Sequence, residues 1–480
     1  MLKIFKKHKL AFTLIELLVV VVIIGIITTI AVTSLNTSRA RTRDAKRVSD
    51  IKQIQTALEL YYSDYEEYPT TLGDSISSGT KIYLASVPTA PTPVDGDCSD
   101  TNNSYTYEVQ GSTNGSYSIS FCLGSNVGEI LAGVNFAIPG EITSPTFAWQ
   151  NVGTAGFSTG MAFYYVSIVI YNDVPYITYM DYTESVFTVM IMKFNGTTWE
   201  NVGTSGISNA YYPSLAVYND DLYMVYADGN NSFKAVVMKF NGTSWDTVGS
   251  SGFSTGGAEG LSLTVYNGYP YVAYGDVDNS YKATVMKYNG STWETVVVSE
   301  NSIDNGYSII VFDGTPYMLY KNPENFKITV TKYNGSTWET VGNSEFSIGQ
   351  ADHVSLVGYN EDLYVTYKDT SNSSKATVMK YDGSTWGAVG TAGFSDGQTE
   401  YPFLAIYNGI PYVSYLDVFN SSKATVKKFN GSVWETVGSS GFSAGETMFL
   451  YLAFSNGTPY VAYMDGGNSG KATVMKYDVE

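Results

Sequence analysis

The chain has 480 residues, which is long for a single compact core, so two or more structural units are expected. Only 15% of the residues are charged, and the content of Tyr (41) and Gly (46) is typical of an extracellular β protein. The formal net charge is -18, and from Phe147 onward 16 Lys stand against 31 Asp and Glu. This charge balance repels a phosphate backbone, so no nucleic-acid binding is expected in that part of the chain.

The chain opens with a basic segment followed by one long apolar run. The first nine residues carry four lysines, and residues 12–32 are mostly apolar and long enough to cross a bilayer as a helix. The small residue Ala11 precedes the run, whereas an ordinary secretory signal has small residues after it. Glu16 places a carboxylate one turn into the run, where a charge normally needs a partner.

The stretch "AFTLIEL" (11–17) resembles the prepilin leader of type IV pilins and type II secretion pseudopilins. The resemblance implies cleavage between Ala11 and Phe12 by a prepilin peptidase, and N-methylation of Phe12. It implies that Glu16 meets an N-terminal amine when subunits assemble. Two positions depart from the family pattern, Ala11 where Gly is usual and Thr33 where many members have Pro. An uncleaved membrane anchor is the alternative interpretation.

The same resemblance implies a location and a set of partners. The chain would sit in the inner membrane as a single-pass protein before assembly, and would then be extracellular in a pilus or pseudopilus. Its partners would be other pilin subunits, the prepilin peptidase and the inner-membrane assembly machinery.

Residues 34–138 are predicted to form a pilin-like body, a long helix packed on a small antiparallel sheet. A mostly apolar stripe at three- and four-residue steps continues the helix, and Pro69 is expected to end it. The stripe consists of Val48, Ile51, Gln55, Leu58 and Tyr62. The four Arg of the chain all lie at 39–47, where they are expected to face solvent, lipid head groups or acidic neighbouring subunits.

The segment "SYTYEVQGSTNGSYSISFCL" (104–123) predicts a hairpin around "STNGS", and "KIYLASVP" predicts a further strand before it. Cys98 and Cys122 are the two cysteines, and in an exported protein such a pair predicts one disulfide. The expected organisation is a leader (1–11), a transmembrane and assembly helix (12–33), the body (34–138), a linker (139–146) and a second domain (147–480).

The second domain is repetitive. Its Trp residues are spaced by 50, 46, 48, 45, 48 and 48 residues, and each unit holds four short β runs separated by turn signals. Seven such units predict an all-β seven-bladed propeller. The region begins with the Trp run "FAWQNVG" and stops after "KATVMKY", so the first strand is expected to complete the last blade. A β-solenoid is the alternative.

The repeats resemble propeller repeats of many secreted bacterial proteins, and "YDGSTW" (381–386) is similar to the Asp-box turn of sialidase-like propellers but one residue shorter. No Arg follows Arg47 and His353 is the only His beyond the leader, which disfavours a sialidase, a Ser-His-Asp site and His-based zinc. Two carboxylates suffice for a glycosidase, but no pair stands out from its copies. We therefore predict no enzyme and no cofactor.

One acidic residue ends the "YPYVAYGD" run in six of the units. Its structural interpretation is an Asx-type turn cap, and its functional interpretation is a ligand face for sugars, cations or a cationic protein, with Tyr211, Tyr212 and Tyr401 in the adjacent long loops. The sequence "DVDN" (276–279) leaves calcium as an alternative in one unit. The candidate ligand face consists of Asp181, Asp228, Asp276, Asp369, Asp417 and Asp465, with Asn322 in the fourth unit.

Two functions follow from this organisation. The first is a minor, tip-located pilin-like subunit whose propeller serves adhesion or recognition of an extracellular glycan or protein. The second is a structural pseudopilin of a type II secretion or uptake system, whose propeller binds cargo or a machine component.

Overall fold

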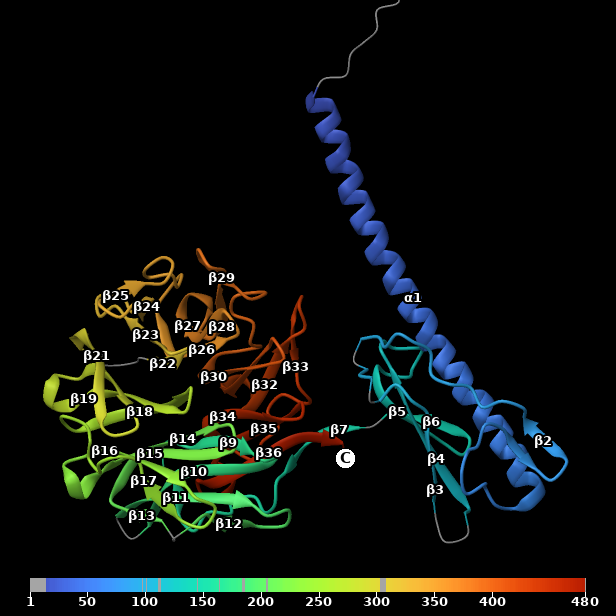
Figure 1. The fold of residues 1–480 in the computed structure, drawn as a ribbon, viewed down its shortest axis with the longest axis horizontal. Coiled ribbons are helices and arrows are strands. Elements are labelled where there is room, and N and C mark those ends of the chain that lie inside the picture. Colours follow the sequence, from blue (N-terminus) through green and yellow to red (C-terminus); the bar gives the residue numbers. More distant parts are fainter. Residues whose placement is uncertain are drawn as a thin grey trace, which may run out of the picture. The chain divides into compact units, whose positions relative to one another are not determined.

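The computed structural model describes residues 14–480 except positions 97, 101, 111–113, 145, 164, 184–185, 204–205, 303–307 and 480, and no side chains at 14–34 or 300–302. The processing residues Ala11 and Phe12 and the side chain of Glu16 therefore lie outside the described residues. The chain divides into two compact units, one ending at Thr146 and the other beginning at Phe147 (Figure 1).

The first unit is built on helix α1 (Leu14–Tyr65). The predicted stripe is confirmed at Val48, Ile51 and Leu58, which are buried, and Ile54 joins them in the core. Gln55 lies beside this core, and its amide donates to the Ile138 and Glu141 carbonyl oxygens. Within the described part of the chain, no helix meets the length and apolarity needed to cross a membrane.

The helix ends earlier than predicted. Its last residue is Tyr65, four positions before Pro69, so the prediction that Pro69 ends it was wrong. Glu66 adopts a left-handed φ of 58°, and its N–H donates to the Tyr62 carbonyl oxygen at 2.8 Å. Such a left-handed residue after the last turn terminates a helix by itself.

A four-stranded antiparallel sheet in the order β3-β4-β5-β6 packs against α1. The predicted hairpin is confirmed, since Tyr107 faces Ile119 and Val109 faces Tyr117 across β3 and β4. Strand β6 lies inside the predicted linker 139–146, and "KIYL" pairs in a separate two-stranded sheet. The strands are β1 (Ile76–Ser78), β2 (Lys81–Leu84), β3 (Thr106–Gln110), β4 (Ser116–Leu123), β5 (Gly133–Ile138) and β6 (Glu141–Thr143).

The second unit consists of antiparallel sheets built mostly from four strands each, and each sheet takes the name of its innermost strand. The β9 sheet holds β8 (Met161–Ala162), β9 (Ser167–Tyr171), β10 (Val174–Thr183), β11 (Val186–Phe194), β12 (Trp199–Asn201) and β13 (Ile207–Ser208). The β14 sheet holds β14 (Ala210–Tyr218), β15 (Asp221–Asp228), β16 (Lys234–Phe240) and β17 (Trp245–Thr247). The β18 sheet holds β18 (Ala258–Tyr266), β19 (Tyr269–Asp276), β20 (Lys282–Tyr288) and β21 (Trp293–Ser302).

Four more sheets follow in chain order. The β22 sheet holds β22 (Ser308–Phe312), β23 (Thr315–Lys321), β24 (Ile328–Tyr333) and β25 (Trp338–Thr340). The β26 sheet holds β26 (Ala351–Tyr359), β27 (Asp362–Asp369), β28 (Lys375–Tyr381) and β29 (Trp386–Ala388). The β30 sheet holds β30 (Thr399–Tyr407), β31 (Ile410–Asp417), β32 (Lys423–Phe429) and β33 (Trp434–Thr436). The β34 sheet holds β34 (Thr447–Ser455), β35 (Thr458–Asp465), β36 (Lys471–Val479) and β7 (Phe147–Asn151).

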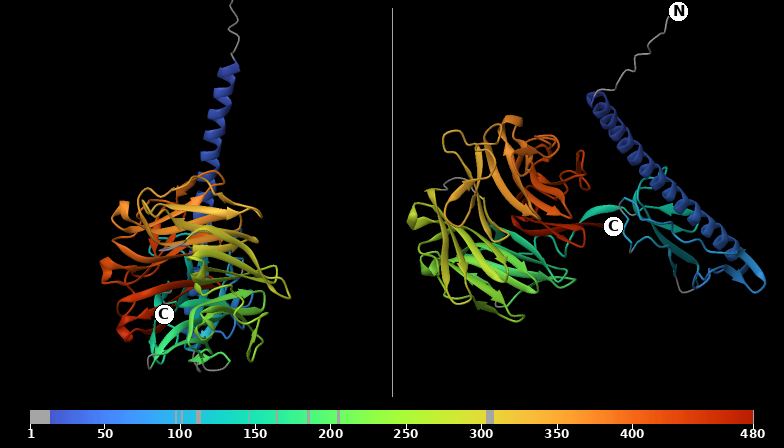
Figure 2. Two further views of the ribbon diagram at one scale, coloured as in Figure 1. Left: turned by 90° about the vertical axis from the view of Figure 1, so that its left-hand side faces the viewer. Right: turned by 45° about the horizontal axis from the view of Figure 1, so that its top comes forward.

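The sheets form a closed ring (Figures 1 and 2). The innermost strands of successive sheets contact one another in chain order, and β34 contacts β9. The predicted closure is confirmed, because β7, from the start of the unit, pairs with β36 from its end, with Trp149 opposite Tyr477. No edge strand is left at the join, which is how propellers avoid open edges.

Six of the seven Trp residues bond their sheet to the sheet before it, whereas the buried Nε1 of Trp338, in the β22 sheet, has no hydrogen-bond partner among the described residues. Trp293 Nε1 donates to the Val248 carbonyl oxygen at 2.9 Å, and the Trp293 ring stacks on Phe253, with centroids 3.8 Å apart. Gly249 has a φ of 71°, and a Cβ there would lie 3.0 Å from Trp293 Cδ1, so only glycine fits this approach. The same Nε1 bond is made by Trp149, Trp199, Trp245, Trp386 and Trp434.

Candidate ligand site at the central cavity

The structure places the acidic residues predicted as a ligand face mostly inside the fold. Five are buried, Asp181, Asp276, Asp369, Asp417 and Asp465, and Asp228 is half-buried. A short 3₁₀ turn follows five of the six, namely η1 (Gly229–Asn231), η2 (Val277–Asn279), η3 (Thr370–Asn372), η4 (Val418–Asn420) and η5 (Gly466–Asn468).

Asp228, Asp369 and Asp465 each accept a backbone N–H of the turn that follows them, whereas Asp276 and Asp417 make no such cap bond. Asp465 accepts from Gly467 N–H at 3.0 Å and from Thr473 Oγ1 at 2.9 Å. Asp181 accepts from Thr159 Oγ1 and Gly160 N–H, both at 3.0 Å, which confirms that the turns and the long loops share a face. The turn-capping interpretation is confirmed at Asp228, Asp369 and Asp465 and was wrong for Asp276 and Asp417, whose buried Oδ1 atoms have no hydrogen-bond partner among the described residues. A role of the carboxylates toward a ligand stays a prediction.

A cavity of about 550 Å³ lies at the centre of the ring and is lined by residues of the innermost strands. Cavities of about 300–1,000 Å³ are the usual size of small-molecule sites. Several positions of each innermost strand line this cavity, and one of them can be compared across all seven sheets. It is a serine in five sheets: Ser167, Ser214, Ser262, Ser308 and Ser355. In the β30 and β34 sheets the same position holds Phe403 and Tyr451.

A collar of aromatic side chains surrounds the end of the cavity at which the innermost strands begin. Each collar residue lies two positions before the cavity position just described, and each has a left-handed φ. The angles are 51° at Tyr165, 55° at Tyr212, 47° at His353, 50° at Tyr401 and 55° at Phe449, and Gly260 takes 61° in the β18 sheet. Bulky residues are rarely found there, and each costs about 1–2 kcal/mol relative to the ordinary conformation.

β-Bulges accompany the left-handed backbone of the collar at Tyr212, Gly260, His353, Tyr401 and Phe449. The register of β14 shifts between Tyr211 and Ser214, and that of β30 shifts between Glu400 and Phe403. Bulges re-aim side chains near functional sites. The expectation that Tyr211, Tyr212 and Tyr401 lie in long loops was wrong, because they lie within β14 and β30.

Neighbouring collar rings touch. The centroids of His353 and Tyr401 are 4.2 Å apart, those of Tyr401 and Phe449 are 5.4 Å apart, and those of Tyr165 and Tyr212 are 4.8 Å apart. These separations fit the tilted and edge-on pairs that aromatic rings prefer. The rings therefore support one another at the cavity mouth.

Two of the collar residues each contact a glutamate of the next sheet. Tyr212 Oη donates to Glu259 Oε1 at 3.1 Å, and His353 Nε2 lies 3.1 Å from Glu400 Oε2. Lys368 Nζ donates to Glu400 Oε1 at 2.5 Å, and Lys321 Nζ lies 3.2 Å from Asp352. The acidic side chains around His353 are thus paired with lysines.

Burial sets the protonation of these collar groups. Desolvation lowers the pKa of His353 below its ordinary value, and the Glu400 carboxylate opposes this shift. Burial, and next the Glu259 carboxylate, raise the pKa of Tyr212, so its phenol keeps its proton. Near neutral pH, His353 thus has one ring nitrogen that donates and one that accepts.

The collar was missed in the sequence. Its signal is a column of residues two positions before the serine, or its aromatic replacement, of each innermost strand, as in "YYPSL", "AEGLSL" and "ADHVSL". Nothing in that column's composition shows that its backbone is left-handed. Across the residues that the structure describes, no group of three or more His, Cys, Asp or Glu side chains is placed to hold a metal ion.

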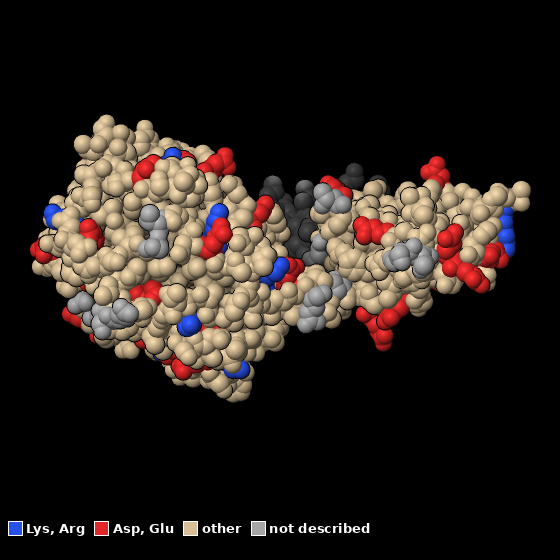
Figure 3. Space-filling view, turned by 90° about the horizontal axis from the view of Figure 1, so that it is seen from below, with Lys and Arg blue, Asp and Glu red and all other residues tan. Residues whose placement is uncertain are grey.

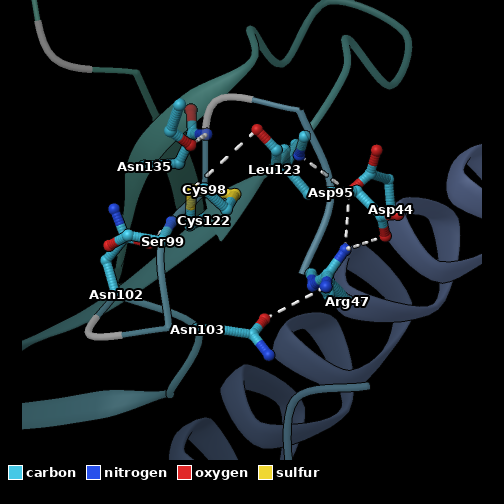
Figure 4. Close-up of a disulfide and its surroundings, with 12 residues drawn as sticks. Asp44, Arg47, Asp95, Cys98, Ser99, Asn102, Asn103, Cys122, Leu123 and Asn135 are labelled. Carbon is cyan, nitrogen blue, oxygen red and sulfur yellow. Dashed lines mark hydrogen bonds and ion pairs between the residues drawn. A yellow bond between two sulfur atoms is a disulfide. The ribbon is translucent and has the colours of Figure 1, made fainter. Parts of the chain in front are cut away.

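The first unit has a buried ionic cluster beside its disulfide (Figure 4). The predicted Cys98–Cys122 disulfide is confirmed. Arg47 is fully buried, and its Nη1 donates to Asp44 Oδ1 at 2.7 Å. Arg43 Nε donates to Asp95 Oδ2 at 2.7 Å. The expectation that the Arg cluster faces solvent or lipid was therefore wrong for Arg47, although Arg39 and Arg41 are exposed.

On the side of the molecule shown in Figure 3, charged atoms over the second unit are scattered, with red carboxylates and blue ammonium groups among uncharged residues. The negative net charge is thus dispersed over this side.

The methylation motif and the N-terminal relatives were found by comparison with known proteins. A model of the prokaryotic N-terminal methylation motif matches residues 6–32, as predicted from residues 11–17. The chain is 39% identical over 66 residues to the type II secretion system core protein G of Aeromonas hydrophila, covering 14% of this chain and 46% of that protein. Against the same protein of Escherichia coli (strain K12) it is 42% identical over 60 residues, covering 12% and 41%. The chain thus spans about half the length of the curated relatives it matches.

Solved propeller structures resemble much of the chain more weakly. The propeller domain of the trilobed protease from Pyrococcus furiosus is 11% identical with a TM-score of 0.45, and the match covers 66% of this chain and 96% of that one. The SapL1 lectin in complex with alpha methyl fucoside is 15% identical with a TM-score of 0.40, and that match covers 60% and 97%. Both TM-scores are low, and no conclusion rests on either similarity.

Proposed function

We propose that this chain is a minor, tip-located subunit of a type IV pilin-like filament whose propeller recognises a ligand outside the cell. The proposal depends on one observation. The same chain has a prepilin methylation motif at residues 6–32 and a closed ring of sheets with an aromatic collar at its cavity. We take the sheets of the second unit as the blades of a seven-bladed propeller, and the first unit as a pilin-like body.

Assembly follows from the N-terminal motif. Prepilin peptidase cuts between Ala11 and Phe12, Phe12 is N-methylated, and Glu16 pairs with the N-terminal amine of its own or a neighbouring subunit. The chain is held in the inner membrane until the assembly machinery extracts it. A carboxylate with a partner amine is far less costly in an apolar bundle than one alone, which favours this pairing during assembly.

The size of the second unit supports a place at the filament tip. A domain of its length has a radius of gyration of about 20 Å. Repeating such a domain on every subunit of a tightly packed helical filament would crowd its neighbours, whereas a single copy at the end meets no such limit. Recognition rather than catalysis is the role we assign to the propeller.

A pseudopilin of a type II secretion system is the second candidate. It is favoured by the identity of 39% over 66 residues to core protein G of Aeromonas hydrophila. In that case the propeller binds exported cargo or a component of the machine, and it stays within the envelope.

Immunogold electron microscopy of intact cells distinguishes the two functions. Antibody against residues 147–480 should label filament ends. Antibody against residues 34–138 is the control, because it reports whether antibody can reach the first unit of the same chain. Label along whole filaments refutes the tip position, and label that appears only after the envelope is opened favours the pseudopilin. Mass spectrometry of the purified protein should find methylated Phe12 as the first residue.

A further inference from the structure

The central cavity has two unlike walls. Five sheets contribute a serine hydroxyl at the cavity position, and Ser308 Oγ accepts the Leu356 N–H at 3.2 Å, which fixes that oxygen. The β30 and β34 sheets, which are neighbours in the ring, contribute aromatic rings instead. One part of the wall therefore offers hydroxyl groups, and the other offers flat apolar surfaces.

The aromatic wall has two layers. At the collar, the Tyr401 and Phe449 centroids are 5.4 Å apart, and at the cavity position the Phe403 and Tyr451 centroids are 4.8 Å apart. All four side chains are half-buried and line the cavity. Together they give this side of the cavity four aromatic rings, two at the mouth and two further along the strands.

The polar groups beside this wall are balanced in charge. Glu400 accepts from Lys368 Nζ and from Gln398 Nε2, and contacts His353. Side-chain exposure is 23% for Glu400, 14% for Lys368 and 33% for His353, and of the three His353 lines the cavity, with Glu400 and Lys368 paired beside it. Because the carboxylate is already paired with an ammonium group, this rim attracts a free cation or anion only weakly. It offers both donors and acceptors at short range.

A ligand that fits these walls must be uncharged, must donate and accept hydrogen bonds around its edge, and must present an apolar face. A pyranose ring has these properties, since its C–H face stacks on aromatic rings and its hydroxyls both donate and accept. The strained backbone of the collar aims the aromatic side chains at the place where this stacking would occur.

We propose that the mouth of the central cavity binds a pyranose unit of a neutral glycan, stacked on the wall of Tyr401, Phe403, Phe449 and Tyr451. Its hydroxyls bond to Glu400, Lys368 and His353 at the rim and to serine hydroxyls across the cavity. The proposal deepens the recognition role given above and rests on it, because it names the class of ligand that the propeller takes.

The test uses the purified full chain in detergent and an array of neutral oligosaccharides, followed by titration calorimetry with the oligosaccharide that binds best. The variant Phe403→Ser/Tyr451→Ser places at both positions the serine that the other five sheets hold there, so the fold is expected to accept it. Its matched control is Phe419→Ser, which removes a 76% exposed aromatic ring from the η4 turn between β31 and β32, outside the cavity.

We expect the double variant to bind the oligosaccharide at least tenfold more weakly, and Phe419→Ser to bind it like the unaltered chain. Binding should be the same at low and high salt, because the ligand is uncharged. The proposal is overturned if no neutral oligosaccharide binds, or if the double variant binds it as tightly as the unaltered chain does. Glycan binding without filament-end labelling would refute the tip function alone, and labelling without binding would refute this inference alone.

Discussion

Replacing Arg47 by Leu should destabilise the first unit severely. The Arg47 and Asp44 side chains are both fully buried, and their charged atoms are 2.7 Å apart. Without the guanidinium, Asp44 keeps only the Gly124 N–H at 2.9 Å and the Ser125 hydroxyl at 2.7 Å as donors. Removing one partner of a buried ion pair costs about 3–5 kcal/mol, and the two remaining donors place the expected loss near the lower end, at about 3 kcal/mol.

The two units can be followed separately in one urea titration. All seven Trp lie at or beyond Trp149, so their fluorescence reports the propeller, and the α-helical circular dichroism comes from α1 among the described residues. With an m value of about 1.5–2 kcal/mol/M, the midpoint of the helical signal should fall by about 1.5–2 M. The Trp transition should not move.

The control is Arg41→Leu, the same change at an exposed position of the same helix. It should shift the midpoint by less than about 0.3 M, because exposed substitutions rarely exceed about 0.5 kcal/mol. Equal shifts for the two variants, or a shift confined to the Trp signal, would refute the assignment of Arg47 to the core of the first unit.

Three further predictions concern single groups. The Arg43 guanidinium holds the pKa of Asp95 below its unfolded value, so the stability that this ion pair contributes is present above about pH 4 and is lost as pH falls through the folded pKa of Asp95. Arg43→Gln should flatten the acid dependence of the helical urea midpoint. Identical pH profiles for the variant and the unaltered chain would contradict this prediction. Reducing the disulfide, whose cysteines are 24 residues apart, should cost the first unit about 3.5 kcal/mol by loop closure, and Cys98→Ser/Cys122→Ser should show the same loss without reductant. Ser254→Ala leaves the buried Ala235 N–H unpaired and should cost the propeller about 1–3 kcal/mol in the Trp transition, whereas the exposed Ser432→Ala should cost nothing measurable.

Features set by local chemistry or by period could be predicted from the sequence. The Trp period predicts the sheets, since six of the seven indoles bond to a carbonyl oxygen of the preceding sheet, and the "STNGS" sequence predicts the hairpin between Thr106 and Leu123. The disulfide follows from two cysteines in one short segment. These signals act over a few residues or repeat along the chain, so a single sequence reveals them.

Features set by tertiary contacts could not be predicted. Glu66 ends α1 in a left-handed conformation that its residue type does not demand, and Arg47 is buried because Asp44 and Asp95 surround it. Strand β6 is only three residues long and forms because β5 is available to pair with it. The sequence predicts loops at Tyr212 and Tyr401, because the alternation of apolar residues does not reveal a bulge inside a strand.

Because the fold repeats, a side chain that packing requires at a given position can be told apart from one that differs between sheets. Equivalent positions of the innermost strands share one backbone environment, and serine satisfies it in five sheets. A requirement that all seven sheets share therefore does not explain the aromatic side chains of Phe403 and Tyr451. The same holds for the bulky collar side chains, because Gly260 adopts the same left-handed φ without strain. A collar of five strained residues costs on the order of 5 kcal/mol, comparable to the whole stability margin of many domains. Bulky residues with a left-handed φ also occur outside the cavity, at Phe233, Tyr281 and Phe326, so what sets the collar apart is that its strained residues lie around one cavity beside an aromatic wall.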